Sequence, residues 1–348
     1  MKMKWITTTA AAAIAVMATA GAASAEGELN IYNWGDYTSP ELITKFEKEY
    51  DVKVTITDYD SNDTALAKVR AGGHGFDIVV PSANYVPIWV KQGLLLEARP
   101  DQMENFKNVD ERWVDVPWDE GRHYTVPWQW GLTGIGVNTS VYDGDINTSA
   151  IFLDPPEELV GKINVAPEMN DVLFATIKYF GGDWCTTDKD LLRKVRDKLV
   201  EAKTKWLAMD YSVTDKLPAG EYDAVYYWNG AIMRSRLQNP DIKFGYPKEG
   251  FPYFMDSVAV LKDAKNPENA KLFMNFIMDP ENMAAASNYV YYANGNKASQ
   301  EFLNEDVIGD PAIYPTEEAV KNLYTVTPYP PKVNRVVTRT WTSVKSGQ

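Results

Sequence analysis

Between residues 29 and 80, short apolar segments alternate with amphipathic ones. Ser39 and Pro40 are typical of a helix start, and apolar residues follow them at helical spacing. The order of the elements is β-α-β-α-β, which predicts a mostly parallel sheet with right-handed crossovers. Such sheets bind ligands beyond the carboxyl ends of their strands. The expected strands are residues 29–32, 52–56 and 76–80, and the expected helices are residues 39–50 and 63–71.

The alternation continues through the middle of the chain, without a repeat or a flexible linker. The apolar part of residues 124–138 predicts a strand that leads out of the first lobe. Further strands are expected at residues 163–166, 224–228 and 257–261, and helices at residues 167–180, 188–206 and 267–278. A chain of 348 residues is long for one domain. We therefore expect an α/β protein of two lobes joined by several crossover strands, with a cleft between the lobes.

The N-terminus has the pattern of a secretion signal. Lys2 and Lys4 precede an apolar run over residues 6–20, and Ala23-Ser24-Ala25 supplies small residues for cleavage. The alternative, a membrane anchor, is disfavoured because the run is short and rich in alanine. The expected division is a signal peptide at 1–25, a first lobe at 26–136 plus 257–300, and a second lobe at 137–256 plus 301–348. We expect the mature protein in the periplasm or an equivalent space.

The composition restricts the possible functions. The net charge of −13 disfavours binding to nucleic acid and to anionic membrane surfaces. Cys185 is the only cysteine, so no intramolecular disulfide forms. Only His74 and His123 could act as imidazole ligands or bases, which argues against a histidine-rich metal site and most Ser-His-Asp hydrolases. We expect no cofactor, no metal and no catalytic residues.

Aromatic residues recur beside carboxylates, and this is the chemistry that stands out. Aromatic faces attract ammonium groups by about 2 kcal/mol once desolvated. Carboxylates add charge-assisted hydrogen bonds of about 1.5–3 kcal/mol. Such clusters along a cleft suit a flexible molecule with amines at its ends. The candidate residues are Trp34, Asp36 and Tyr37 in one loop, Glu168 and Asp171 in one helical turn, Trp228 at a strand end, Phe254 and Asp256, and Tyr292.

Each of these residues also has a simpler structural explanation. Trp34 and Tyr37 could belong to the core, and Asp256 could be a turn or cap residue. Glu168 and Asp171 could simply complement the dipole of their helix. From the residues alone, the prediction is an exported two-lobed α/β binding protein for a cation.

Several motifs resemble those of the periplasmic spermidine/putrescine-binding proteins, a branch of the type II solute-binding family. They occur in order across the chain, and the C-terminal motif is most similar to putrescine-type members. The motifs are Ile31-Tyr32-Asn33-Trp34-Gly35-Asp36-Tyr37, residues 76–82, residues 133–138, Trp228-Asn229-Gly230, residues 246–250, Phe254-Met255-Asp256-Ser257 and residues 335–341. The resemblance implies two α/β lobes, each a mixed, mostly parallel sheet flanked by helices, that close on a polyamine. It also implies delivery to the inner-membrane permease of an ABC importer.

The resemblance assigns ligand-binding positions residue by residue. The aromatic and acidic residues of the family's first loop are matched by Trp34, Asp36 and Tyr37. A serine that lines the family's cleft is matched by Ser82. The second lobe supplies a carboxylate pair and an aromatic wall. The remaining matches are Glu168, Asp171, Trp228, Asp256 and Tyr292, with Asn84 where spermidine-type members carry tyrosine.

Other positions each depart from one subgroup, so the site matches neither subgroup fully. Phe254 stands where spermidine-type members carry a tryptophan, and Ala231 stands where putrescine-type members carry an acid. Thr327-Pro328-Tyr329 replaces a segment that holds an amine-contacting glutamine. The length and the number of amines of the ligand are therefore open, while its cationic character is retained.

Two other functions are weighed against polyamine binding. An amphoteric amine such as γ-aminobutyrate would need a cation in the cleft, and we expect Arg234 and Arg236 to be solvated on a helix instead. Paired carboxylates beside aromatics also occur in carbohydrate-active enzymes, but the motifs resemble those of binding proteins. We expect a monomeric, non-catalytic solute-binding protein.

Overall fold

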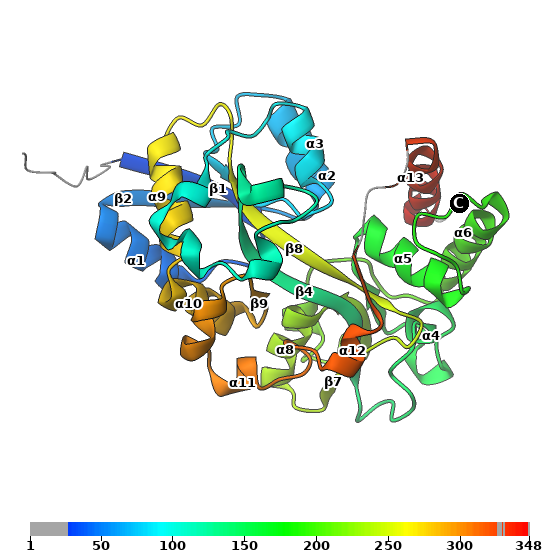
Figure 1. The fold of residues 1–348 in the computed structure, drawn as a ribbon. Coiled ribbons are helices and arrows are strands. Elements are labelled where there is room, and N and C mark those ends of the chain that lie inside the picture. The colour runs from blue at the N-terminus through cyan, green and yellow to red at the C-terminus, as the bar shows by residue number, and fades with distance from the viewer. Residues whose placement is uncertain (1–26, 326–328, 330, 347–348) are drawn as a thin grey trace, which may run out of the picture.

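The computed structural model describes residues 27–325, 329 and 331–346 (Figure 1). The expected signal peptide over residues 1–25, and Thr327 and Pro328 of the divergent C-terminal segment, lie outside the described residues. The strands are β1 (Gly27–Trp34), β2 (Val52–Tyr59), β3 (Ile78–Val79), β4 (Thr125–Asn138), β5 (Ile163–Val165), β6 (Ala224–Trp228), β7 (Ile242–Gly245), β8 (Phe251–Val260), β9 (Ala293–Asn294) and β10 (Leu323–Thr325).

The helices lie on both sides of these strands, and most of the long ones agree with the expected positions. The longer helices are α1 (Pro40–Tyr50), α2 (Asn62–Arg70), α5 (Met169–Tyr179), α6 (Lys189–Lys203), α8 (Asn229–Gln238), α9 (Pro267–Ile277), α10 (Pro280–Val290) and α13 (Pro331–Ser346). The shorter helices are α3 (Val86–Lys91), α4 (Ala150–Leu153), α7 (Val213–Lys216), α11 (Glu305–Ile308) and α12 (Glu317–Val320).

The strands form two mixed sheets that share β4. In the first sheet, β1 pairs in parallel with β2 and β3, and β8 joins β3 and the first half of β4 in antiparallel fashion. In the second sheet, the other half of β4 is antiparallel to β6 and β7, and β5 is parallel to β6. Parallel pairing is thus found in the outer strands, as the β-α-β pattern predicts, whereas each strand paired with β4 runs antiparallel to it.

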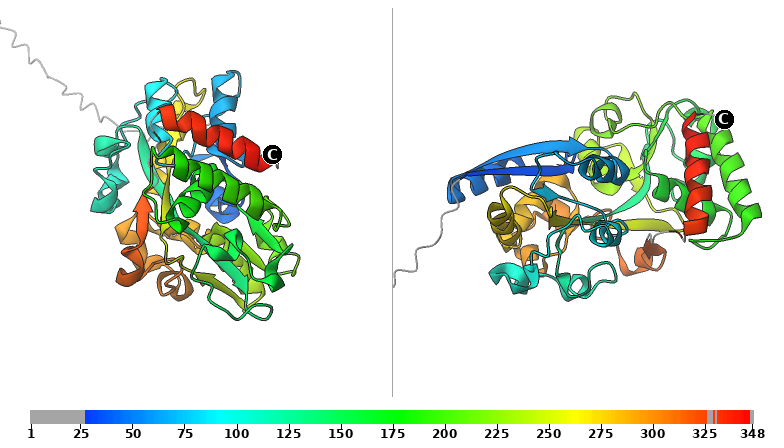
Figure 2. Two further views of the ribbon diagram at one scale, coloured as in Figure 1. Left: turned by 90° about the vertical axis from the view of Figure 1, so that its right-hand side faces the viewer. Right: turned by 90° about the horizontal axis from the view of Figure 1, so that it is seen from above.

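Two long strands connect the ends of the molecule. Figure 1 shows β4 and β8 running from the end that carries α1 and α9 towards the end that carries α5, α6 and α13. All fourteen residues of β4 are buried. The C-terminal helix α13 lies beside α6, as both views in Figure 2 show. The lobe nearer α13 is therefore completed by the last segment of the chain.

The expected strand at residues 257–261 is only the second half of β8. The strand begins at Phe251 and includes Pro252 and Asp256, which break the apolar pattern. Pairing with β4 on one side and β10 on the other holds this half of the strand in place. Tertiary pairing therefore extends the strand beyond the segment that its local pattern indicates.

Helix α1 forms because its cap and its apolar stripe agree. The Ser39 hydroxyl accepts a hydrogen bond from the Leu42 amide at 3.3 Å, and Pro40 occupies the first turn. Phe46, which is fully buried, packs against Phe273 of α9 with ring centroids 5.1 Å apart. The apolar face of α1 thus packs against α9, a helix that lies more than two hundred residues later in the chain.

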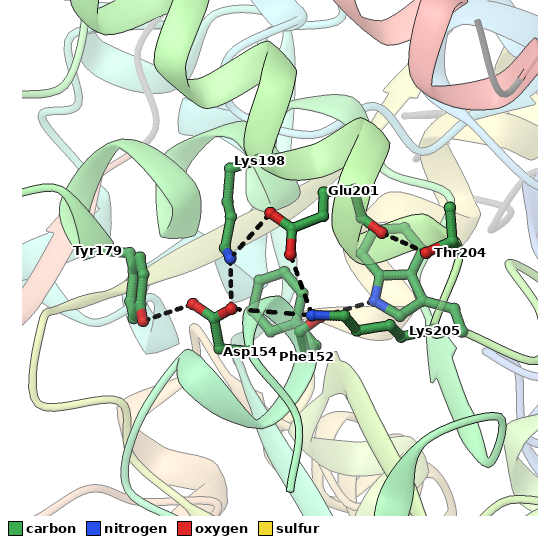
Figure 3. A network of polar contacts seen from close by, with 8 residues as sticks. Phe152, Asp154, Tyr179, Lys198, Glu201, Thr204 and Lys205 are labelled. Carbon is green, nitrogen blue, oxygen red and sulfur yellow. Dashed lines mark hydrogen bonds and ion pairs between the residues drawn. The ribbon is translucent and has the colours of Figure 1, made fainter. Parts of the chain in front are cut away.

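A surface network of ion pairs holds α4, α5 and α6 together (Figure 3). The Asp154 carboxylate accepts hydrogen bonds from the Tyr179 hydroxyl at 2.9 Å and from Lys198. Glu201 pairs with Lys198 at 3.4 Å and with Lys205 at 3.1 Å. Because these groups are partly exposed, each pair contributes little by itself, and the value of the network lies in fixing the helix positions.

Asp77 connects distant parts of the first sheet. Its fully buried carboxylate accepts hydrogen bonds from the backbone amides of Asn30 at 2.9 Å and Asn266 at 2.8 Å. Its backbone carbonyl also accepts a hydrogen bond from the Leu261 amide at 2.8 Å. The residue therefore ties β1 to the turn between β8 and α9.

Replacing this carboxylate tests its structural role. Asp77→Ala leaves buried backbone donors without acceptors, so the free energy of unfolding should fall by about 2–4 kcal/mol. Urea denaturation of the two proteins measures the difference. Asp215→Ala, at an exposed position of α7, is the matched control and should change stability by less than about 0.5 kcal/mol. An Asp77→Ala protein as stable as the control would show that the carboxylate is dispensable.

Candidate functional site

All ten residues singled out in the sequence line one cavity of about 440 Å³. They come from widely separated segments: the loop after β1, the loop after β3, the start of α5, the end of β6, β8, and the segment after α10. Segments that belong to or follow strands of both sheets therefore line the same cavity. The ten are Trp34, Asp36, Tyr37, Ser82, Asn84, Glu168, Asp171, Trp228, Asp256 and Tyr292.

Two tryptophans meet across the cavity. Trp34 ends β1 and Trp228 ends β6, and their ring centroids are 6.3 Å apart in an edge-to-face arrangement. The Trp34 indole donates a hydrogen bond to the Val80 carbonyl at 3.0 Å. The Trp228 indole donates one to the Asp171 carboxylate at 3.2 Å. Both rings are thus fixed in orientation, with apolar surface turned to the cavity.

Asp256 is the acid held by the first sheet. Ser82 forms an isolated antiparallel bridge with Asp256, and its hydroxyl donates a hydrogen bond to the carboxylate at 2.6 Å. Asn62 orients this serine by donating to its hydroxyl at 3.0 Å and accepting from its backbone amide at 3.1 Å. Burial raises the pKa of Asp256 to about 7, against the opposing effects of the Ser82 and Tyr37 hydroxyls.

Tyr37 stands beside this acid. Its ring is 5 % exposed and meets Tyr292 edge to face at a centroid distance of 5.4 Å. Burial and the nearby Asp256 raise the pKa of the Tyr37 hydroxyl far above its usual range. Among the described residues, no partner meets this hydroxyl with hydrogen-bond geometry. The hydroxyl nevertheless acts on Asp256, whose pKa it lowers, so Tyr37 and this acid form one part of the cavity wall.

The second sheet contributes two acids at the start of α5. Glu168 caps the helix by accepting from the Asn170 amide at 3.4 Å, and Asp171 accepts a hydrogen bond from the Thr133 hydroxyl at 2.6 Å. Burial and the adjacent Asp171 raise the pKa of Glu168, and burial raises the pKa of Asp171. Glu168 is thus the N-cap residue of α5, and both carboxylates also line the cavity.

The remaining predicted residues lie nearer the rim or behind the acids. Asp36 is exposed and adopts a left-handed backbone conformation, with φ of 54°, in the turn after β1. Asn84 is half-buried. Tyr292 is buried directly against Gly230, where a Cβ atom would lie 2.5 Å from the tyrosine ring. Glycine is required there so that α8 can approach this aromatic wall.

Several residues of the cavity were not singled out in the sequence. Asn62 lies at the start of a helix and Tyr211 in a loop, where polar and aromatic residues carry no signal of their own. Phe254 was a candidate beside Asp256 and also a departure from the family pattern, but it was not among the ten assigned residues. Residues of this kind could have been found only by knowing which segments meet in space.

The expectation that Arg234 and Arg236 are solvated is wrong, because both are half-buried. Arg234 lines the cavity, while Arg236 forms an ion pair with Asp310. Tyr329 of the divergent C-terminal segment lies in the core beside Trp184, at a centroid distance of 4.4 Å, and does not line the cavity.

The chemistry of the cavity is that of a cation receptor. Within the described residues, Asp256, Glu168 and Asp171 form no ion pair with a lysine, arginine or histidine. Aromatic rings cover the space between these acids. Ammonium groups would restore the charge balance, and a methylene chain between them would pack on the rings.

Comparison with known proteins agrees with this description. Residues 41–316 match the family model described as bacterial extracellular solute-binding protein. The putrescine-binding periplasmic protein SpuD of Pseudomonas aeruginosa is 32% identical over 92% of this chain and 92% of its own. The putrescine-binding periplasmic protein PotF of Escherichia coli is 30% identical over 100% of this chain and 99% of its own.

A solved structure of a related protein has a similar fold. A putative spermidine/putrescine ABC transporter protein from Listeria monocytogenes superposes with a TM-score of 0.86 at 29% identity, covering 92% of this chain and 99% of that one. Over the part of the chain that the structure describes, no helix combines the length and apolarity needed to cross a bilayer. With most of its length inside the matching model, the chain belongs to the bacterial extracellular solute-binding proteins.

Proposed function

We propose that this protein captures a polyamine of the putrescine or spermidine class outside the cytoplasm and delivers it to an ABC importer. The observation that carries the proposal is the set of buried acids without cationic partners, Asp256 on one side of the cavity and Glu168 with Asp171 on the other. The printed names of the relatives support the ligand class. The protein acts as a monomeric periplasmic receptor and not as an enzyme.

The mechanism is closure of two lobes on the ligand. One lobe comprises residues 26–136 plus 257–300, and the other comprises residues 137–256 plus 301–348, with β4 and β8 crossing between them. One ammonium group pairs with Asp256 and a second with Glu168 and Asp171. Because the ligand touches both lobes, its binding energy favours the closed form. The closed form presents the surface that the permease recognises.

The binding site consists of the ten residues assigned above. Trp34, Tyr37 and Trp228 supply the apolar walls, and Ser82 orients Asp256. Asp36 and Asn84 complete the rim of the cavity on the first lobe. Tyr292 completes the wall behind Asp256. A micromolar affinity needs about −8 kcal/mol, which two desolvated ammonium sites supply after the ordering costs.

Calorimetry on protein refolded without co-purified ligand tests the function. We expect tight binding of putrescine, spermidine or agmatine. γ-Aminobutyrate should bind less tightly, because its single ammonium group can pair with only one of the two acidic sides of the cavity. Binding of γ-aminobutyrate alone, or of none of the four, would refute a polyamine receptor.

Removing the charge of Asp256 should weaken ligand binding. Asp256→Asn keeps the size of the side chain and loses the charge, so the affinity for putrescine should fall about ten-fold or more. Asp263→Asn is the matched control, because Asp263 follows the same strand but is exposed and outside the cavity. Titration calorimetry of the three proteins decides the matter. Equal affinities would remove Asp256 from the site.

The affinity should also depend on pH. The pKa of Asp256 in the ligand-free protein is about 7, and an ammonium ligand binds its ionised form, so binding releases a proton below this pH. Aliphatic amines stay protonated throughout this range. The affinity should therefore fall about ten-fold between pH 8 and pH 6 from this group alone.

Asp256→Asn supplies the control for this dependence. The variant lacks the titrating group, so its affinity should change less over the same range, with the remaining change due to Glu168 and Asp171. An affinity of the unaltered protein that stays constant or rises on acidification would contradict the assignment.

A further inference from the structure

Asn62 lines the cavity without belonging to the ten assigned residues, and it is the first residue of α2. The start of the helix fixes its place, because the Ser61 hydroxyl accepts a hydrogen bond from the Thr64 amide at 3.2 Å. The side chain of Asn62 is 4 % exposed and reaches the loop after β3, where it contacts Ser82. Asn62 is thus a buried polar residue whose partner belongs to the candidate site.

Two hydrogen bonds determine which end of the Asn62 side chain faces the Ser82 hydroxyl. The backbone amide of Ser82 can only donate, and it donates to the side-chain oxygen of Asn62 at 3.1 Å. The side-chain nitrogen of Asn62 then faces the Ser82 hydroxyl oxygen, to which it donates at 3.0 Å. The orientation of the Asn62 amide group therefore follows from the backbone N–H group of Ser82.

The same contacts direct the hydroxyl proton of Ser82. Because the hydroxyl oxygen accepts from Asn62, its single proton is left for another acceptor, and this acceptor is the Asp256 carboxylate at 2.6 Å. A hydrogen-bond donor at such a distance favours the ionised form of a carboxyl group. The chain of hydrogen bonds thus runs in one direction, from Asn62 through Ser82 to Asp256.

Backbone pairing already holds Ser82 opposite Asp256 without help from Asn62. The two residues form an antiparallel bridge, which is flanked by backbone hydrogen bonds of 2.8 Å and 3.0 Å between the loop after β3 and β8. The backbone leaves the direction of the Ser82 hydroxyl undetermined. Asn62 supplies this remaining constraint.

We propose that Asn62 is a positioning residue of the binding site: it directs the Ser82 hydroxyl at Asp256 and so keeps this carboxylate charged for an ammonium group. The inference rests on the proposed polyamine function. Because Asn62 acts through the charge of Asp256, its effect on ligand binding grows as the pH falls. The other titratable groups that interact with Asp256 are Tyr37, Tyr59, Tyr292 and Asp171. They are the same in every variant below, so a difference between variants does not come from them.

The test compares the putrescine dissociation constants of variant and unaltered protein, measured by titration calorimetry at pH 6 and pH 8.5. Asn62→Leu removes the donor, so the Ser82 hydroxyl can turn away from Asp256. Putrescine binding should weaken about ten-fold at pH 6 and less than about two-fold at pH 8.5, as expected when Asp256 titrates about one pH unit higher. Asn62→Ala removes the same donor without adding apolar bulk and should give the same pair of values.

Ser82→Ala tests whether the effect passes through the serine. Its putrescine binding should weaken with the same dependence on pH. The double variant Asn62→Leu/Ser82→Ala should bind putrescine no more weakly than Ser82→Ala alone, because Asn62 then has no hydroxyl to direct. Additive effects would mean that Asn62 contacts the ligand directly as part of the cavity wall, and would overturn the proposal.

Asn282→Leu is the matched control. Asn282 is also 4 % exposed and donates a hydrogen bond to the Phe276 carbonyl at 2.9 Å, but it lies on α10 outside the cavity. The variant should be less stable to urea and should bind putrescine like the unaltered protein at both pH values. If Asn62→Leu and Asn62→Ala weaken binding equally at pH 6 and pH 8.5, or not at all, Asn62 only supports the fold and the proposal is overturned.

The outcome for the function itself is separate. An unaltered protein that binds no polyamine refutes the proposed function, and the role of Asn62 with it. An unaltered protein that binds putrescine, with a pH dependence that does not respond to Asn62, refutes only the role of Asn62.

Discussion

Three carboxyl groups are buried without an ion-pair partner among the described residues, and this is the constraint on which the site depends. Asp256 is held by the first sheet, and Glu168 and Asp171 by the second. Burial of an unpaired carboxylate is costly, and here the cost appears as raised pKa values. A cation that pairs with both sides relieves this cost only when the lobes meet. In the proposed mechanism, ligand binding and lobe closure are therefore coupled by electrostatics.

The fold places these acids by sharing strands between its two parts. β4 is a member of both sheets, and β8 carries Asp256 in the half that pairs with the first part of β4. Ser82 reaches Asp256 because the loop after β3 bridges β8 at that residue. Close packing then fixes the aromatic wall, since Gly230 allows Tyr292 to lie directly on α8. If the angle between the lobes changes in the proposed closure, the distance between Asp256 and the pair on α5 changes more than the hydrogen bonds that hold each acid.

Local pattern was sufficient for most elements, but not for the cavity. The cap and stripe of α1 predict that helix correctly, because neighbouring residues determine both. The start of β8 was missed, because Pro252 and Asp256 interrupt its pattern and only pairing with β4 and β10 reveals it. Eight of the ten cavity residues stood out as aromatics and carboxylates, whereas Ser82 and Asn84 were assigned only by resemblance to a family. Spacing alone did not show that the ten meet in space. Arg234 was misjudged because the sequence of α8 does not show which side faces the cleft.

Attraction alone cannot explain a choice among polyamines. Putrescine and spermidine both offer two ammonium groups to Asp256 and to the pair on α5, so these acids define the class of ligand and not its length. Adding an acid would extend the preference to ligands of higher charge, whereas a cation at one end penalises every ligand that brings a charge there. Both kinds of group line this cavity besides the three buried acids, Asp36 as an acid and Arg234 as a cation. The preferred length of the ligand therefore depends on how these charges are distributed along the cavity wall, and not on the buried acids alone.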